Sequence, residues 1–243
     1  MRGRVRFRFG RRVLSVFFPD RCAVCGKVVR PEEGICPDCR AAIPRVGIPV
    51  CPFCGAEKEY CICRKRRRHY ESVAAPWYYD GGAASAILRM KASGDPVAAV
   101  TFAREMADTA EQYYGDIAFD GVVFVPSFGT TERRRGYNPG RMIAEELAAL
   151  LGLPVLPALE KVIETKPQKG LTAVERSGNV LGTFDLKEGA DVAGKTLLLA
   201  DDILTTGSTA DECAKMLKIY GAEAVYVVAC AITRPEKEKK TEE

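Results

Sequence analysis

The sequence predicts an α/β domain with a mainly parallel sheet, preceded by a small cysteine-rich module. From about residue 70 onward, apolar runs typical of buried strands alternate with segments of helical periodicity, as in a parallel sheet covered by helices. Eight of the ten cysteines lie earlier, between positions 22 and 63. We therefore expect four segments: a basic and apolar lead over 1–21, a cysteine-rich module over 22–69, the α/β domain over 70–233 and a charged tail over 234–243.

The eight clustered cysteines come in closely spaced pairs, and two such pairs supply the four thiolates of a tetrahedral Zn²⁺ site. The module has little apolar content of its own, so bound metal would have to support its folding. The clustering, without a recognisable secretory signal, favours metal over disulfides and predicts a cytoplasmic protein. Sequential pairing, four and four with two structural zinc ions, is the simplest arrangement, and an interleaved pairing stays open. The expected zinc ligands are Cys22, Cys25, Cys36, Cys39, Cys51, Cys54, Cys61 and Cys63.

Charge is divided unequally along the chain. Residues 1–69 hold 17 Lys and Arg against 6 Asp and Glu, a net charge of +11, whereas the remainder has a net charge of −7. Two zinc ions with eight thiolates would lower the first value to about +7. A run of five basic residues follows the last clustered cysteine: Arg64, Lys65, Arg66, Arg67 and Arg68. This run is either a solvated linker or a contact to a nucleic-acid backbone, and the arginine-rich lead is a tail, a strand or a nucleic-acid arm.

The domain after residue 70 divides into alternating strands and helices. We expect strands over 72–79, 122–125, 182–186 and 224–232, and helices over 83–93, 96–114 and 138–151. Asn138 before Pro139 is a helix cap followed by a first-turn proline. Polar loops are expected over 127–136 and 161–179. Because no run of about 18 apolar residues occurs, we expect no membrane-spanning helix.

The most informative stretch covers 196–209. An apolar run over 197–200 predicts a strand that is buried on both faces and stops at Asp201 and Asp202. The loop behind it, which leads into a helix, consists of Thr205, Thr206, Gly207, Ser208 and Thr209. Backbone N–H groups at the positive end of a helix bind phosphate, and a glycine lets the anion approach. Vicinal sugar hydroxyls would lie within reach of the two carboxylates, so these residues predict a pocket for a ribose 5-phosphate.

This stretch resembles the signature of type I phosphoribosyltransferases, which implies a type I phosphoribosyltransferase-like core. By this resemblance Asp201 and Asp202 bind the ribose hydroxyls of phosphoribosyl pyrophosphate (PRPP), the 205–209 loop binds its 5-phosphate, and Mg²⁺ accompanies the pyrophosphate. The reaction would be displacement of pyrophosphate from C1 by a nucleophile. The candidates for offsetting pyrophosphate charge, each of which could instead be a solvated surface residue, are Lys91, Arg133, Arg134, Arg135, Lys166 and Lys169. The catalytic base and the acceptor stay unassigned.

A zinc-ribbon front joined to such a core resembles the ComF family, proteins associated with natural competence and DNA uptake in bacteria. Besides the cysteine pairs and 196–209, the segments that carry the resemblance are 18–19, 88–91 with Gly94, 135–138, and 165–171 with Glu175, Arg176 and Asn179. Departures from the family pattern at 123–126, at Pro139 and at Ser177 and Gly178 fall where pyrophosphate would bind. The resemblance therefore implies ligand binding and leaves catalysis open.

Three functions remain open from the sequence. The first, which we favour, is a ComF-type protein in DNA uptake that binds single-stranded DNA through its basic zinc end and PRPP or a related ribose phosphate in its core, with DNA-import proteins as partners. The second is a salvage-type phosphoribosyltransferase of nucleotide metabolism with a zinc appendage. The third is a structural adaptor for a DNA-import motor. The basic front argues against the second, and the intact acidic pair and loop argue against the third.

Overall fold

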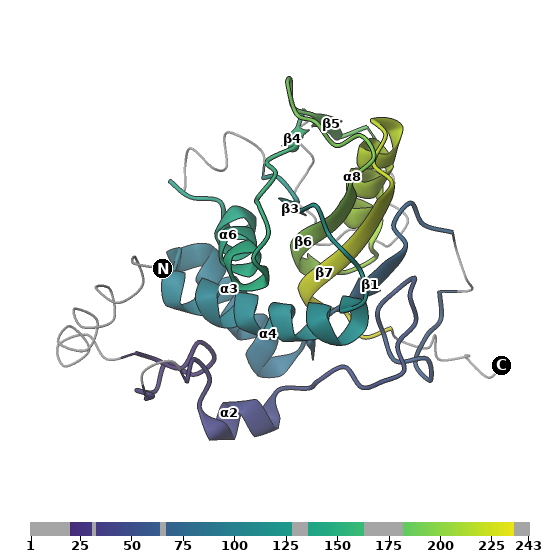
Figure 1. The fold of residues 1–243 in the computed structure, drawn as a ribbon. Helices are drawn as coiled ribbons and strands as arrows, with labels where there is room; N and C mark the ends of the chain where they lie inside the picture. Colours follow the sequence, from purple (N-terminus) through teal and green to yellow (C-terminus); the bar gives the residue numbers. More distant parts are fainter. Residues whose placement is uncertain (1–19, 31–32, 64–66, 128–135, 163–181, 236–243) are drawn as a thin grey trace.

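A parallel five-stranded sheet forms the centre of the protein (Figure 1). The computed structural model describes residues 20–30, 33–63, 67–127, 136–162 and 182–235. The strands follow the order β1-β7-β6-β3, with β2 also paired to β7, and all these pairings are parallel. Their bounds are β1 (Ser72–Ala74), β2 (Trp77–Tyr78), β3 (Gly121–Phe124), β6 (Thr196–Leu204) and β7 (Ala224–Ile232). The predicted α/β fold with a parallel sheet is confirmed.

Helices cover both faces of this sheet, so its central strands are apolar on both sides. In β6, Leu198 and Ala200 belong to one core, whereas Leu197 and Leu199 belong to the other. This alternation is what a pleated strand between two helical layers requires. The first core receives α3 (Gly81–Ser93), α4 (Pro96–Tyr114) and α6 (Pro139–Leu151), and the second receives α8 (Ser208–Ile219). Figure 1 shows the two helical layers on opposite sides of the sheet.

The helix ends follow their sequence signals closely. Asn138 caps α6 by accepting a hydrogen bond from the N–H of Arg141 at 3.2 Å, and Gly152 closes the helix in the left-handed conformation. Asp95 caps α4 in the same way, accepting from Val97 and Ala98. These caps satisfy N–H groups that the first turn of a helix leaves without intrahelical partners. Three of the helices therefore begin within two residues of the position that the sequence predicts.

Two expected strands are shorter than predicted. The strand expected over 72–79 is divided into β1 and β2, because Pro76 has no N–H to donate to a sheet and its carbonyl accepts from Val46 N at 3.1 Å instead. The strand expected over 182–186 is β5 (Phe184–Leu186), which pairs antiparallel with β4 (Leu159–Lys161) in a separate two-stranded sheet. Most of the loop expected over 161–179 lies outside the described residues.

Strand β6 is longer than its apolar run predicts. The prediction that it stops at Asp201 is wrong, because β7 continues to pair with it from Asp201, opposite Ala229, to Leu204, opposite Ile232. On its other side the pairing with β3 ends at Ala200, where Val125 N donates to Ala200 O at 3.1 Å. Beyond Ala200, β6 therefore has a strand neighbour on one side only. Polar side chains are tolerated there because the other side is open.

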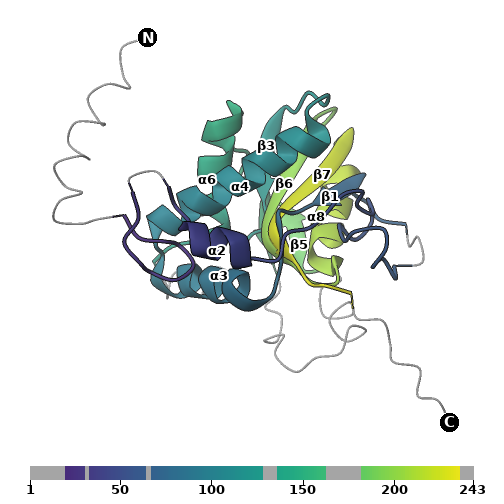
Figure 2. The same ribbon diagram turned by 90° about the horizontal axis from the view of Figure 1, so that it is seen from below.

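The cysteine-rich module packs onto both cores. Its first half contributes Cys22, Ala23 and Ile35 to the core beneath α3 and α4, and the short helix α2 (Pro37–Ala42) lies beside these helices (Figure 2). Its second half contributes Ala56 to the opposite core. The segment between the halves adds to the edge of the sheet, where Tyr78 N donates to Pro44 O at 2.8 Å. The module is thus part of the packed structure of the α/β domain.

A buried carboxylate joins the first half of the module to α4. Glu105 accepts hydrogen bonds from Arg40 at 2.8 Å and from Arg45 at 2.7 Å, and its own side chain is only 8% exposed. A carboxylate at such depth requires this pairing.

None of the helices in the described ranges has the length and apolarity needed to cross a membrane.

Candidate functional site

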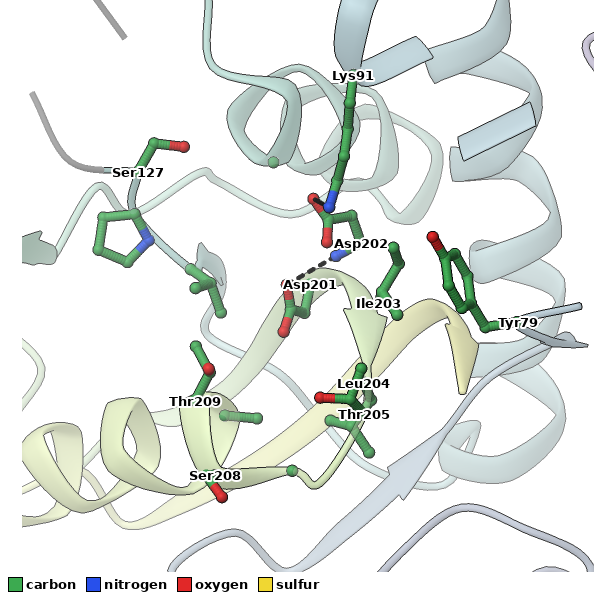
Figure 3. A pocket seen from close by; sticks show the side chains of 15 residues that line it. Tyr79, Lys91, Ser127, Asp201, Asp202, Ile203, Leu204, Thr205, Ser208 and Thr209 are labelled. Atoms are coloured by element: carbon green, nitrogen blue, oxygen red, sulfur yellow. Dashed lines mark hydrogen bonds and ion pairs between the residues drawn. The ribbon is translucent and has the colours of Figure 1, made fainter. Parts of the chain in front are cut away.

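A cavity of about 300 Å³ opens where β3 leaves the side of β6 (Figure 3). This is the carboxyl end of a parallel sheet, where ligands bind in many open α/β folds. Side chains from β6, the following turn, α3 and the segment after β3 line it. The lining residues are Tyr79, Lys91, Val125, Pro126, Ser127, Gly140, Asp201, Asp202, Ile203, Leu204, Thr205, Gly207, Ser208, Thr209 and Ala210.

The two carboxylates lie on opposite faces of β6, because consecutive side chains of a strand alternate. Asp202 is on the face of Leu198 and Ala200, where α3 packs, and its Oδ2 lies 2.8 Å from Lys91 Nζ. Asp201 is on the face of Leu197 and Leu199, where α8 packs. Figure 3 shows Asp202 meeting Lys91 and Asp201 on the side of Thr209. The pair therefore spans the cavity from one helical layer to the other.

Charge in the cavity is nearly balanced. Burial raises the pKa of Asp201 to about 8, and the neighbouring charge of Asp202 adds to the shift, while Lys91 opposes it. Burial alone would lower the pKa of Lys91, but attraction to Asp202 and Asp201 outweighs it, so this pKa is raised. At pH 7 the cavity therefore holds a mostly protonated Asp201 and an ion pair between Asp202 and Lys91. A ligand must share or replace that ion pair.

The turn after β6 leads directly into α8. Gly207 has a φ of +74°, and a Cβ built on it would lie 3.0 Å from Tyr70 Oη, so both the conformation and the space require glycine. The first hydrogen bond of α8 runs from Asp211 N to Gly207 O at 2.9 Å. The backbone N–H groups of the first turn have no acceptor within the helix, so they point away from its start. With the hydroxyls of Ser208 and Thr209, they form an edge of the cavity suited to an anion.

Most of the residues expected to bind the ribose and its 5-phosphate come together in this cavity: Asp201, Asp202, Thr205, Gly207, Ser208 and Thr209. Lys91, which was expected on the pyrophosphate side, also lines it. Thr206 lies behind them in the turn, with its Oγ1 2.8 Å from Ser208 Oγ. The expected pyrophosphate-side residues Arg133, Arg134 and Arg135, like Lys166 and Lys169, lie outside the described residues.

Sequence reasoning missed Tyr79 and Ser127, which also line the cavity. Tyr79 directly follows β2, and Ser127 follows β3 by three residues. Polar residues just past the carboxyl ends of parallel strands gather at one edge of the sheet. That signal was available in the sequence once the strands had been identified.

The cysteines form two clusters of four, in sequential order. The first cluster is Cys22, Cys25, Cys36 and Cys39, and the second cluster is Cys51, Cys54, Cys61 and Cys63; within each, the sulfur atoms lie within 4.8 Å of one another. The Sγ atoms of Cys25 and Cys36 lie 3.7 Å apart, and those of Cys51 and Cys63 lie 3.5 Å apart. Zn–S bonds of about 2.3 Å give a tetrahedron with edges of about 3.8 Å. The ten cysteines, all within the described ranges, form no disulfides, and the two clusters fit two structural zinc ions.

Two residues of the basic run that was expected to contact DNA lie within the described ranges. Arg67 is exposed. Arg68 is only 16% exposed, because its Nη2 donates to Thr206 O at 2.7 Å and its Nη1 lies 3.6 Å from Asp211 Oδ2. Arg68 thus lies against the turn after β6 rather than on an open surface. Arg64, Lys65 and Arg66 lie outside the described residues.

Comparison with known families and proteins agrees with this two-part construction. Residues 13–69 match the Double zinc ribbon domain family, and residues 138–243 match the Phosphoribosyl transferase domain family. Competence protein F of Haemophilus influenzae is 28% identical over 222 residues, covering 87% of this chain and 96% of that protein. Competence protein ComFC of Bacillus subtilis is 25% identical over 207 residues, covering 81% and 83% of the two chains. DNA utilization protein YhgH of Escherichia coli is 26% identical over 210 residues, covering 85% and 87%.

The two clusters predict the metal content of the purified protein. We expect two zinc ions per chain, one for each cluster. Cys25→Ser and Cys54→Ser should each remove one, since three thiolates hold zinc much less tightly than four. Elemental analysis of protein dialysed against metal-free buffer measures this ratio. A wild-type content of one zinc per chain would show that one cluster is not a metal site.

The raised pKa of Asp201 predicts how stability depends on pH. The folded protein keeps a proton on Asp201 up to about pH 8, whereas the unfolded chain releases it near pH 4. This group therefore lowers the free energy of unfolding as the pH rises between those values. Asp201→Asn should be more stable relative to wild type at pH 9 than at pH 6, by about 2 kcal/mol.

Urea unfolding at both pH values, with zinc present throughout, measures the difference. Asp108→Asn, an exposed change on α4, serves as the control and should show no such dependence. An Asp201→Asn effect of the same size at pH 6 and pH 9 would contradict the shifted pKa.

Proposed function

We propose that this chain, a member of the ComF family, binds PRPP or a related ribose 5-phosphate and single-stranded DNA. It belongs to that family because it joins a double zinc ribbon to a phosphoribosyltransferase domain and is a distant homologue of competence protein F. The observation that carries the ligand proposal is that the acidic pair and the turn after β6 line one cavity. The proposed setting is DNA uptake, because relatives bear the names competence protein and DNA utilization protein.

The chemistry of the cavity suits the two ends of a ribose 5-phosphate. The 5-phosphate would accept hydrogen bonds from the N–H groups at the start of α8 and from the hydroxyls of Ser208 and Thr209. The 2′- and 3′-hydroxyls would donate to Asp201 and Asp202. A volume of about 300 Å³ lies at the small end of the range for ligand pockets, which fits a sugar phosphate. Binding at both ends would fix the orientation of C1.

Lys91 and Asp202 would rearrange when such a ligand enters. Their ion pair occupies carboxylate oxygens that the ribose hydroxyls would use. Once those hydroxyls bind Asp202, the ammonium of Lys91 would be available to a ligand phosphate. The carboxylates are also hard oxygen donors that suit Mg²⁺, which would neutralise part of the pyrophosphate charge when PRPP is bound. This chain's own residues would bind and orient the sugar.

The DNA part of the proposal rests on the charge of the first 69 residues. Their formal net charge is +11, and about +7 after allowance for two zinc ions and eight thiolates. Among the described residues of the zinc ribbons, exposed basic side chains include Arg21, Arg30, Lys58 and Arg67. Such a surface attracts the backbone of a nucleic acid independently of its sequence.

Replacing the acidic pair tests the ligand proposal. Asp201→Asn combined with Asp202→Asn should weaken PRPP binding at least about a hundredfold, because uncharged amides replace the carboxyl groups and are weaker acceptors for the ribose hydroxyls. Titration calorimetry with PRPP and Mg²⁺ measures the affinity, and Asp108→Asn is the matched surface control. Unchanged affinity in the double variant would refute the site. Release of pyrophosphate on addition of a free nucleobase would instead support a salvage-type transferase.

Salt dependence tests the DNA proposal. Replacing Arg64, Lys65, Arg66 and Arg67 by Ser, with Arg68 kept, should weaken binding to a labelled single-stranded oligonucleotide. The slope of log affinity against log salt should become shallower by about 0.7 for each DNA phosphate that the variant no longer neutralises. Fluorescence anisotropy at several salt concentrations measures both quantities. Lys187→Ser, an exposed change distant in sequence from the ribbons, is the control, and an unchanged slope in the four-residue variant would refute the role of this basic run.

A further inference from the structure

An arginine from the junction between the second ribbon and the sheet holds the turn after β6. Arg68 lies five residues after Cys63, the last ligand of the second cluster. Its guanidinium contacts two parts of the candidate phosphate site: the carbonyl of Thr206, 2.7 Å from Nη2, and the carboxylate of Asp211, 3.6 Å from Nη1. The Arg68 and Asp211 side chains are 16% and 21% exposed, so water screens this contact little.

Asp211 is an acidic residue in the first turn of α8, the helix whose start faces the cavity. A carboxylate there stabilises the helix, but it also repels a phosphate that binds at the same helix end. The guanidinium of Arg68 is charged at any physiological pH and lies against this carboxylate. The backbone N–H of His69 also donates to Asp211, at 2.7 Å. Arg68 therefore offsets the one acidic group in the first turn of α8.

Tyr70 makes a second link between the ribbon and the same turn. Its hydroxyl donates to the carbonyl of Phe53 at 2.7 Å, inside the metal-binding turn between Cys51 and Cys54. The same hydroxyl is the nearest atom to the Cβ position of Gly207, at 3.0 Å. Tyr70 is buried. Tyr70, two residues after Arg68, is therefore attached to the second ribbon and lies against the turn after β6.

Among the described residues, the first cluster is connected to the cavity through α3, which carries Lys91, and not to the turn after β6. Its ribbon is joined to α4 through Arg40 and Glu105 and to α3 through Arg89, which donates to the carbonyls of Ala23 and Val24. These contacts lie in the helical layer opposite to α8. The two zinc ribbons are therefore attached to different parts of the domain.

We propose that Arg68 is a positioning residue for the phosphate-binding turn, and that through it the second zinc cluster, but not the first, sets the affinity of this turn for a ligand phosphate. The inference rests on the proposed function, since it concerns the same phosphate. It assigns the second ribbon a role in ligand binding besides its structural one.

The first experiment compares two arginines that both join a ribbon to the domain. Arg68→Ala should bind ribose 5-phosphate about tenfold more weakly than wild type, the factor expected for one charge-assisted hydrogen bond. Arg40→Ala, the matched control, should bind within about twofold of wild type. Titration calorimetry measures both affinities, and elemental analysis verifies that both variants keep two zinc ions.

A second variant separates electrostatic positioning from a general loss of structure. Adding Asp211→Asn to Arg68→Ala removes the carboxylate that Arg68 offsets, so it should restore part of the affinity for ribose 5-phosphate. A residue that merely stabilised the fold would lower the urea midpoint and would not be rescued in this way. No rescue, together with a lowered midpoint, would overturn the positioning role.

The zinc part of the proposal is tested by Cys54→Ser and Cys25→Ser. Cys54→Ser should weaken ribose 5-phosphate binding at least as much as Arg68→Ala does, whereas Cys25→Ser should leave it near the wild-type value. Equal losses in both variants would overturn the distinction between the clusters. If the wild-type protein binds ribose 5-phosphate and Arg68→Ala binds it with the same affinity, this inference is overturned and the proposed function is unaffected. A wild-type protein that binds no ribose 5-phosphate would overturn both.

Discussion

The candidate site depends on the pairing of β6 with β7 beyond the end of β3. Up to Ala200, β6 has a partner on each side, and its side chains are apolar because they face two helical layers. After Ala200 only β7 remains. Pairing on that side keeps the backbone extended and fixes the alternation of Asp201 and Asp202, while the place that β3 has left becomes the cavity. Had both neighbours ended together, the acidic pair would lie on an unsupported loop.

The charges in this cavity compensate one another before any ligand is present. The ion pair of Lys91 and Asp202 and the raised pKa of Asp201 both follow from bringing two carboxylates and one ammonium into a place that water reaches poorly. Removal of one partner would leave a charge in poor solvation. A sugar phosphate that binds here would exchange these internal contacts for its own. Its affinity is therefore a difference between two sets of polar interactions rather than a sum of new ones.

The zinc ribbons substitute for hydrophobic core at the edge of the sheet. Small cysteine-rich segments bury too little apolar surface to fold alone, and bound metal supplies the missing stability. In this chain the segment between the ribbons also pairs at the β2 edge, where an uncovered strand would expose unpaired backbone groups. Each ribbon contributes to a different core, so loss of metal from one cluster would weaken first the core against which that ribbon packs.

The sequence by itself determined the elements whose signals are local. The helix Pro96–Tyr114 and the strand Ala224–Ile232 have the predicted bounds, because a first-turn proline, helical periodicity and a β-branched apolar run act within one segment. The spacing of the cysteines identified the eight expected zinc ligands and left an interleaved pairing open, and the structure showed that they group sequentially, four and four. Only the tertiary structure decided how far β6 extends, that Asp202 meets Lys91, and that Arg68 holds the turn before α8. Each of these is a contact between residues far apart in the chain. The length of a strand depends on the neighbouring strands with which it pairs, and the partner of a charged side chain depends on how the helices pack. Neither can be read from the residues of one local segment.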